Sequence, residues 1–96
     1  MTTPARIEKL MSLTVQEFVD TLARLGPATL QPDGTYQYAL PGGSVQISFV
    51  PQQGVTLGGL LALPRARVTL DFDGASAQIR AGFLKRFELT FQRGGG

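Results

Sequence analysis

Two carboxylates, Asp71 and Asp73, stand two residues apart in an alternating segment, a spacing that places both on one face of a strand. Paired carboxylates can bind a divalent cation or divide the roles of acid and base. The string from Asp71 to Gly74 could open a calcium-binding loop, but the next odd position is not acidic, and Gly82 stands where the closing glutamate belongs. We therefore expect a solvated strand face without metal, with Asp73 capping the helix that follows.

The serines and the glycine pairs lack the partners that catalysis or cofactor binding requires. The chain contains no histidine and no cysteine, which removes the usual general base, thiolate chemistry and cysteine-based zinc or iron-sulfur sites. Ser44, Ser48 and Ser76 have neither a histidine partner nor a lysine at the Ser-x-x-Lys spacing. The pairs Gly42-Gly43 and Gly58-Gly59 match neither a dinucleotide fingerprint nor a P-loop. We expect no enzyme activity and no cofactor.

The arginines offer the remaining candidate for a ligand contact. Arg65 and Arg67 share the polar face of a strand with Asp71 and Asp73, so local charge balance is the expected role of these cations. Arg80 differs, because a helical projection of the C-terminal segment places it inside the apolar stripe. We expect its guanidinium to reach solvent at the helix edge, with a buried ion pair or a ligand contact as the alternatives.

The composition indicates one small globular domain. Of the 96 residues, 43% are hydrophobic and 17% are charged, which fits a folded chain with a single core. Nine Lys and Arg against seven Asp and Glu give a net charge of +2, without the concentrated basic patch that drives binding to a phosphate backbone. No apolar stretch is long enough for a membrane helix, and no secretory signal opens the chain. We expect a soluble, cytoplasmic domain with no membrane partner.

The clearest local pattern predicts a helix between Leu13 and Pro27. Thr14 and Glu17 have the spacing of a capping box, apolar residues then recur at helical intervals, and Gly26-Pro27 supplies the stop. Upstream, residues 1–10 are expected to be an N-terminal extension, either a short helix or a frayed arm, that the core does not need.

After the turn-prone segment 31–34 the apolar period changes from about 3.6 to 2. This alternation predicts strands at residues 36–40, 45–49 and 66–73, and the apolar run 55–63 predicts a further strand with a bend at its glycines. Residues 76–93 fit a helix and a strand, and we predict a helix because five apolar residues share one side of the projection. Residues 94–96 are expected to be a flexible glycine tail.

These elements predict an α+β fold within residues 11–93. The order is an N-terminal helix, a four-stranded antiparallel meander and a C-terminal helix, with both helices on one face as a two-layer sandwich. This order is similar to that of double-stranded RNA-binding domains, which carry a lysine cluster at the start of their second helix. The corresponding segment here, residues 74–78, has no lysine, so nucleic-acid binding is expected to be weak at most.

The run from residue 55 to residue 63 is apolar on both strand faces, whereas a half-exposed antiparallel strand alternates. One explanation is a central strand buried by helices and loops, and another is helices on both faces of the sheet. Two helices cover only about one face of a four-stranded sheet, which favours a partner. We expect a non-enzymatic protein-interaction module, most simply a homodimer; the alternatives are binding of a small anionic or apolar ligand near Arg80 and, third, weak nucleic-acid binding. The expected contact residues are Val55, Leu57, Leu60, Leu61 and Leu63.

Overall fold

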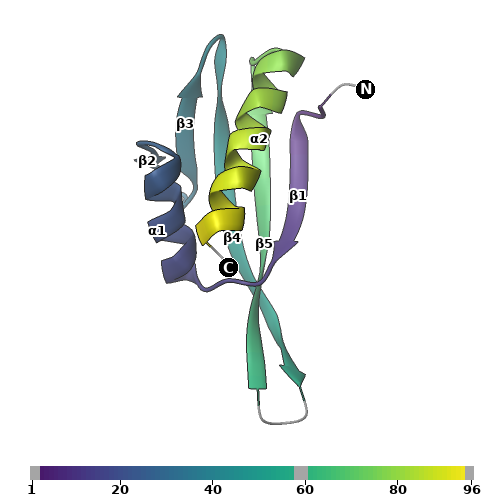
Figure 1. Cartoon of the computed structure of the whole chain (residues 1–96). Helices are drawn as coiled ribbons and strands as arrows, with labels where there is room; N and C mark the ends of the chain where they lie inside the picture. Colours follow the sequence, from purple (N-terminus) through teal and green to yellow (C-terminus); the bar gives the residue numbers. More distant parts are fainter. Residues whose placement is uncertain (1–2, 58–60, 95–96) are drawn as a thin grey trace.

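The computed structural model describes residues 3–57 and 61–94, and the side chains of residues 3–53 and 63–92. The expected α+β architecture with two helices on one sheet is confirmed, with five strands in place of four (Figure 1). In chain order the elements are β1 (Arg6–Met11), α1 (Val15–Leu25), β2 (Thr29–Leu30), β3 (Tyr36–Leu40), β4 (Gly43–Leu57), β5 (Leu61–Asp73) and α2 (Ala77–Gly94).

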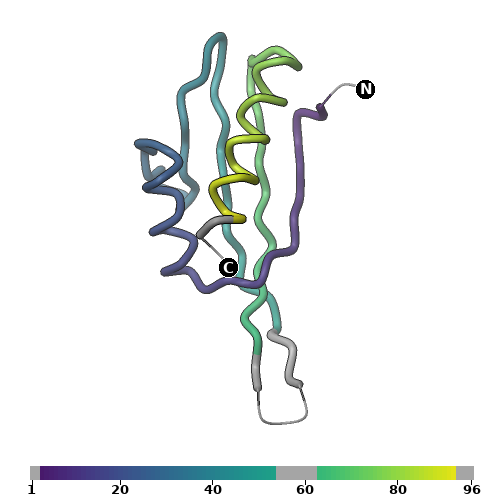
Figure 2. Tube along the Cα trace, in the orientation of Figure 1, coloured from purple at the N-terminus to yellow at the C-terminus, as the bar shows by residue number. Residues whose placement is uncertain are grey.

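The sheet is antiparallel throughout and has the strand order β1-β5-β4-β3-β2. Strands β2 to β5 form a meander, and β1 pairs with β5 at the far edge, with Ile7 opposite Leu70 and Met11 opposite Ala66. The tube in Figure 2 follows the chain from β1 across the end of the helical layer into α1. The N-terminal strand therefore lies beside the last strand of the chain.

The expectation of a helix or a frayed arm over residues 1–10 is wrong, because Arg6–Met11 form strand β1. Exposure alternates along this strand, with Ile7, Lys9 and Met11 partly buried and the residues between them exposed. In so short a segment the apolar residues Ile7, Leu10 and Met11 also fit a helical period, so the sequence pattern could not distinguish a helix from a strand. Pairing with β5 decides it, because the ladder satisfies the backbone groups of the segment.

The chain between the strands predicted at residues 45–49 and 55–63 also differs from expectation. Strand β4 continues through this segment, with a bulge between Gln52 and Val55, and β5 begins at Leu61 and runs through Pro64. Residues 55–63 are therefore not one strand but the ends of two strands and their connection, of which residues 58–60 lie outside the described part.

Pro51 of β4 and Pro64 of β5 both lie where their strand forms an edge of the sheet. β3 pairs with β4 only from Gly43 to Ile47, so one side of β4 is open at Pro51. Likewise β1 ends at Met11, opposite Ala66, so one side of β5 is open at Pro64. The Phe72 N–H donates to Ala5 O at 2.7 Å, so the N–H groups at even-numbered positions of β5 point toward the β1 side. The N–H that Pro64 lacks would therefore point to the open side of β5. Proline is tolerated at such edges, where it costs no ladder bond.

Helix α1 begins and ends as the sequence predicts. The Glu17 N–H donates to Thr14 Oγ1 at 3.2 Å, the Thr14 N–H donates to Glu17 Oε1 at 2.8 Å, and Gly26 at φ 145° ends the helix. Helix α2 is capped by Ser76, whose Oγ accepts from the Ile79 N–H at 3.2 Å, so the expected cap by Asp73 is wrong. Residue 94 ends α2, and residues 95–96 of the expected tail lie outside the described part. Neither helix in the described residues is long and apolar enough to cross a membrane.

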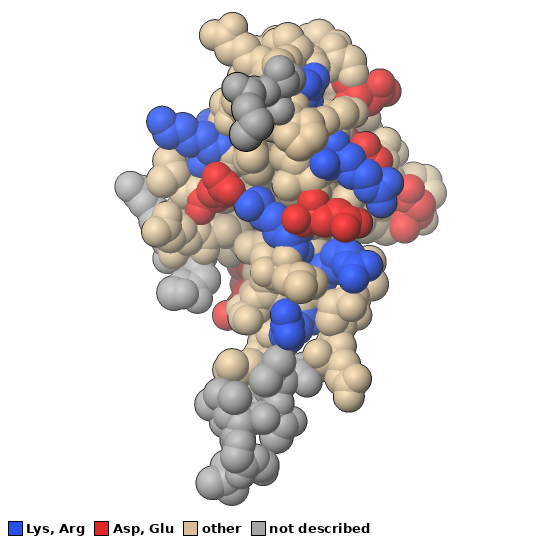
Figure 3. Space-filling model, turned by 90° about the vertical axis from the view of Figure 1, so that its right-hand side faces the viewer, with Lys and Arg blue, Asp and Glu red and all other residues tan. Residues whose placement is uncertain are grey.

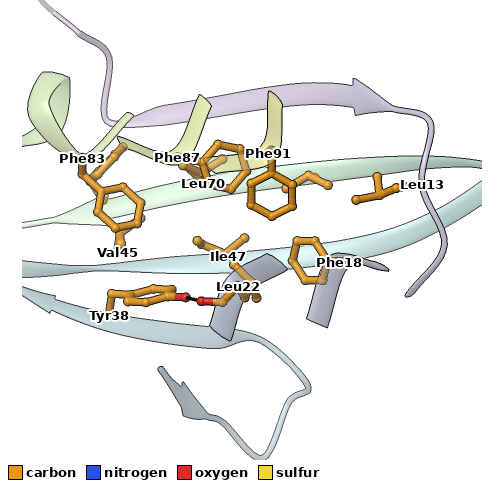
Figure 4. Packing of buried hydrophobic residues seen from close by; sticks show 12 residues of the cluster. Leu13, Phe18, Leu22, Tyr38, Val45, Ile47, Leu70, Phe83, Phe87 and Phe91 are labelled. Atoms are coloured by element: carbon orange, nitrogen blue, oxygen red, sulfur yellow. Dashed lines mark hydrogen bonds between the residues drawn. The ribbon is translucent and has the colours of Figure 1, made fainter. Parts of the chain in front are cut away.

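The core lies between the two helices and the sheet face that they cover (Figure 4). Phe18 and Leu22 of α1 meet the phenylalanines of α2 above the strands, and the Phe87 and Phe91 rings lie 4.3 Å apart between centroids. Tyr38 donates its hydroxyl to Leu22 O at 2.8 Å, and burial raises the pKa of Tyr38 to about 12. The buried side chains of the sheet are Tyr38, Val45, Ile47, Ala66, Val68, Leu70 and Phe72.

Candidate functional site

The face of the sheet turned away from the helices, called the outer face below, is lined by alternate residues of β5. The residues between them, Ala66, Val68, Leu70 and Phe72, are buried against the helices. The outer residues of β5 are two arginines, one threonine and two aspartates, all of them exposed or partly exposed. They are Arg65, Arg67, Thr69, Asp71 and Asp73.

Neighbouring strands add uncharged polar groups and two exposed apolar side chains to the outer face. Leu10 of β1 and Val50 of β4 are both register partners of Arg67, so they lie on either side of it. They are 59% and 49% exposed, respectively. The polar neighbours on β4 are Ser44, Gln46, Ser48 and Gln52.

The charged pairs within the outer face are weak. Arg6 lies 4.0 Å from a carboxylate oxygen of Glu8 and 4.0 Å from one of Asp71, and all three side chains are more than half exposed. Exposed pairs of this kind contribute about 0–1 kcal/mol. Within the described residues no third His, Cys, Asp or Glu joins Asp71 and Asp73 in a metal-binding group. Both aspartates are exposed to solvent.

Beyond the sheet body, β4 and β5 continue as a two-stranded arm, defined here as residues 52–57 and 61–64. Figure 1 shows this arm projecting past both helices and past the end of β1. In its register Val55 pairs with Leu63 and Leu57 with Leu61, so the structure brings four of the five predicted contact residues together on one arm. The fifth, Leu60, lies outside the described residues, as do the side chains of Val55, Leu57 and Leu61. Leu63 is described and is 37% exposed.

The composition of the arm separates it from the rest of the surface. No residue from position 51 to position 64 is charged. By contrast, Figure 3, which views the molecule from the side of β1, shows acidic and basic side chains interspersed over the body above the arm. The arm is thus an uncharged extension of a mixed-charge domain.

Arg80 lies apart from both the arm and the outer face. Its Nε donates to Thr3 O at 2.9 Å and its Nη1 donates to Ala75 O at 2.7 Å. The guanidinium therefore joins the start of α2 to the segment before β1, and the two carbonyls satisfy part of its hydrogen-bonding capacity. This local role needs neither an ion pair nor a ligand.

A groove that the sequence did not indicate lies between β1 and α2. It has a volume of about 630 Å³, its lining includes Met11, Phe87 and Phe91, and the Lys9 Nζ lies 2.7 Å from Glu88 Oε2 at its border. Sequence reasoning missed it because β1 was expected to be a helix or an arm. The sequence held no clear signal for it, because Lys9 interrupts the apolar alternation that would have indicated a strand at residues 6–11.

The outer face, the arm and the groove are the candidate surfaces of the described residues. The outer face and the arm are continuous, since Leu63 and Arg65 are two residues apart on β5. Comparison of the chain with protein-family models and with curated proteins finds no match.

Proposed function

We propose that this chain is a small, non-enzymatic protein-interaction module that forms a homodimer, with the β4–β5 arm as its docking element. The observation that supports the proposal is the arm itself, a two-stranded ribbon without charged residues that extends past both helices. A two-stranded ribbon on its own is only marginally stable in water, so this arm gains stability when a partner covers it.

The prolines indicate how the arm docks. Pro51 and Pro64 stand at the open edges of the two strands, where they remove N–H donors that an added strand would need. Pairing by strand addition along the arm is therefore disfavoured. The faces of the arm remain available, and Leu63, still 37% exposed, is the described side chain that they offer.

A second copy of the chain is the simplest partner. The arm is uncharged, and the chain carries two further exposed apolar side chains near the base of the arm, Leu10 and Val50, which association with a second copy can bury along with it. A two-fold homodimer uses the same patch on both copies, so each substitution counts twice.

The test compares Leu63→Asp with Leu89→Asp, a control that introduces the same charge at an apolar side chain of α2 that is 49% exposed. Size exclusion with light scattering is run from about 1 µM to about 1 mM for both variants and the parent chain. We expect a dimer for the parent and for Leu89→Asp, and a folded monomer for Leu63→Asp. A parent chain that is monomeric over the whole range contradicts the proposal, as does an unchanged dimer in Leu63→Asp.

A further inference from the structure

The outer face of β5 carries its charges in an order that is complementary to its own reverse. From the arm toward α2 its outward-facing positions, which are exposed or partly exposed, read Arg65, Arg67, Thr69, Asp71 and Asp73. Two cations, a neutral centre and two anions follow one another at a two-residue spacing. If a second copy lies on this face with its β5 running in the opposite direction and the two Thr69 residues facing each other, each arginine faces an aspartate.

We infer that a second copy of this chain stacks on the outer face, with the two β5 strands antiparallel and the two-fold axis passing midway between the two Thr69 residues, perpendicular to the strands. Arg67 then faces Asp71 of the second copy, and Arg65 faces its Asp73, each contact occurring twice. The inference rests on the proposed homodimer and adds which face is covered and in which direction the partner runs. Stacked sheets lie about 10 Å apart with their strands within about 30°, a gap that the long arginine side chains can span.

The surroundings of β5 suit a stacked sheet. A polar hollow of about 320 Å³, lined by Gln46, Asp71, Phe72 and Asp73, opens at the acidic end of the strand and can receive a guanidinium. Ser44 and Ser48 of β4 are small and uncharged, so they allow a close approach beside the charged rows. Covering the outer face also removes the exposed apolar surface of Leu10 and Val50 from water.

The charges also distinguish this arrangement from the other face-to-face dimer. A two-fold axis parallel to the strands places Arg65 on Arg65 and Asp73 on Asp73 of the second copy, and like charges in contact oppose association. In the antiparallel arrangement the one like-charged contact is at the margin of the interface. There Glu8, the register partner of Thr69 on β1, faces Glu8 of the second copy. There Arg6, 4.0 Å from Glu8, supplies a cation beside it.

The antiparallel arrangement also places the arms. Counting from Thr69, Leu63 of one copy falls opposite position 75 of the other, so each arm reaches the far end of its partner's sheet. The arm and the outer face are then two parts of one interface, with charge pairs at its centre and uncharged arms at both ends.

Charge reversal tests the inference. Arg67→Asp and Asp71→Arg each replace two attractive contacts by two repulsive ones, and the double variant restores attraction with the signs exchanged. By sedimentation equilibrium at about 50 mM salt we expect each single variant to weaken the dimer at least about tenfold and the double variant to lie within about threefold of the parent. Lys85→Glu, on the exposed side of α2, changes the net charge as much as Arg67→Asp and is expected to leave the dimer unchanged.

Circular dichroism melts of every variant separate loss of association from loss of folding. If the parent dimerises but the single variants match it, the stacked outer face is wrong and the homodimer through the arm stands. If the single variants weaken the dimer and the double variant does not recover, the antiparallel direction is wrong. If charge reversal behaves as expected while Leu63→Asp leaves the dimer intact, the outer face stands and the arm as docking element fails.

Discussion

Removing the hydroxyl of Tyr38 tests the account of the core most directly. This hydroxyl donates to Leu22 O at 2.8 Å, within a side chain that is only 6% exposed. Leu22 O also accepts from the Gly26 N–H at 3.3 Å, so the carbonyl keeps one partner in Tyr38→Phe. The substitution therefore removes one hydrogen bond without leaving a buried acceptor unpaired, and we expect a loss of about 1 kcal/mol in the free energy of unfolding at pH 7.

The same residue predicts an alkaline effect with a defined sign. Burial raises the pKa of Tyr38 to about 12 in the folded state, whereas an unfolded tyrosine ionises near pH 10. The native state thus favours the neutral phenol, and the associated stability is complete below about pH 10 and is lost as pH rises through about 12. Two pKa units correspond to at most about 2.7 kcal/mol, and Tyr38→Phe should lack this loss.

Urea denaturation of the parent and Tyr38→Phe at pH values from about 8 to about 12 measures both effects. All other titratable groups are common to the two proteins, so the difference between the two curves isolates Tyr38. Tyr36→Phe, a partly exposed tyrosine on the same strand, is the control for loss of a hydroxyl. If the parent and Tyr38→Phe remain parallel up to about pH 12, the raised pKa is refuted.

Four further predictions concern stability and binding. Thr14→Ala removes the cap of α1 and should lower the free energy of unfolding by about 1 kcal/mol in urea titrations, and an unchanged midpoint would contradict the cap. Gly43→Ala should cost at least about 2 kcal/mol, because the added Cβ overlaps the Asp73 carbonyl oxygen, whereas Gly82→Ala, with no atom within 4 Å of its Cβ, should be neutral or stabilising in thermal melts. With no histidine in the chain, stability should change by less than about 1.5 kcal/mol between about pH 5.5 and 7.5 in denaturation series. Duplex RNA should give no complex at about 150 mM salt in a fluorescence titration, and submicromolar binding would contradict this.

Sequence reasoning predicted those elements whose signals are local. The capping box of Thr14 and Glu17 fixes the start of α1, and strict alternation fixes the body of β5 with its buried and outer sides. The helical projection of residues 76–93 also predicted α2 correctly, because five apolar residues share one side of the helix, although Leu89 lies on the other side.

The predictions that failed concern segments in which strand pairing, rather than local residue preference, determines the structure. Strand β1 is defined by its contacts with β5, at a distance along the chain that no local pattern reports. Pro51 and Pro64 are ordinary turn signals in sequence, and only the open edges beside them permit both to stand inside strands. Residues 55–63 were therefore predicted as one bent strand, although the same apolar residues were selected for contact. The charge order of β5 was visible in the sequence, but its meaning depends on all five side chains lying on the one sheet face that the helices leave uncovered (Figure 1).

The pairing of β1 with β5 also constrains the order of folding. Most of the described chain lies between Ile7 and its partner Leu70, so this edge closes a long loop, and contacts of that kind form slowly. During synthesis β1 leaves the ribosome before its partner strand β5, with α1, β2, β3 and β4 between them. Until β5 arrives, the apolar side chains Ile7 and Met11 have no sheet to join. Completion of the sheet is therefore a late, single event in which one strand aligns the N-terminal edge, the arm and the outer face together.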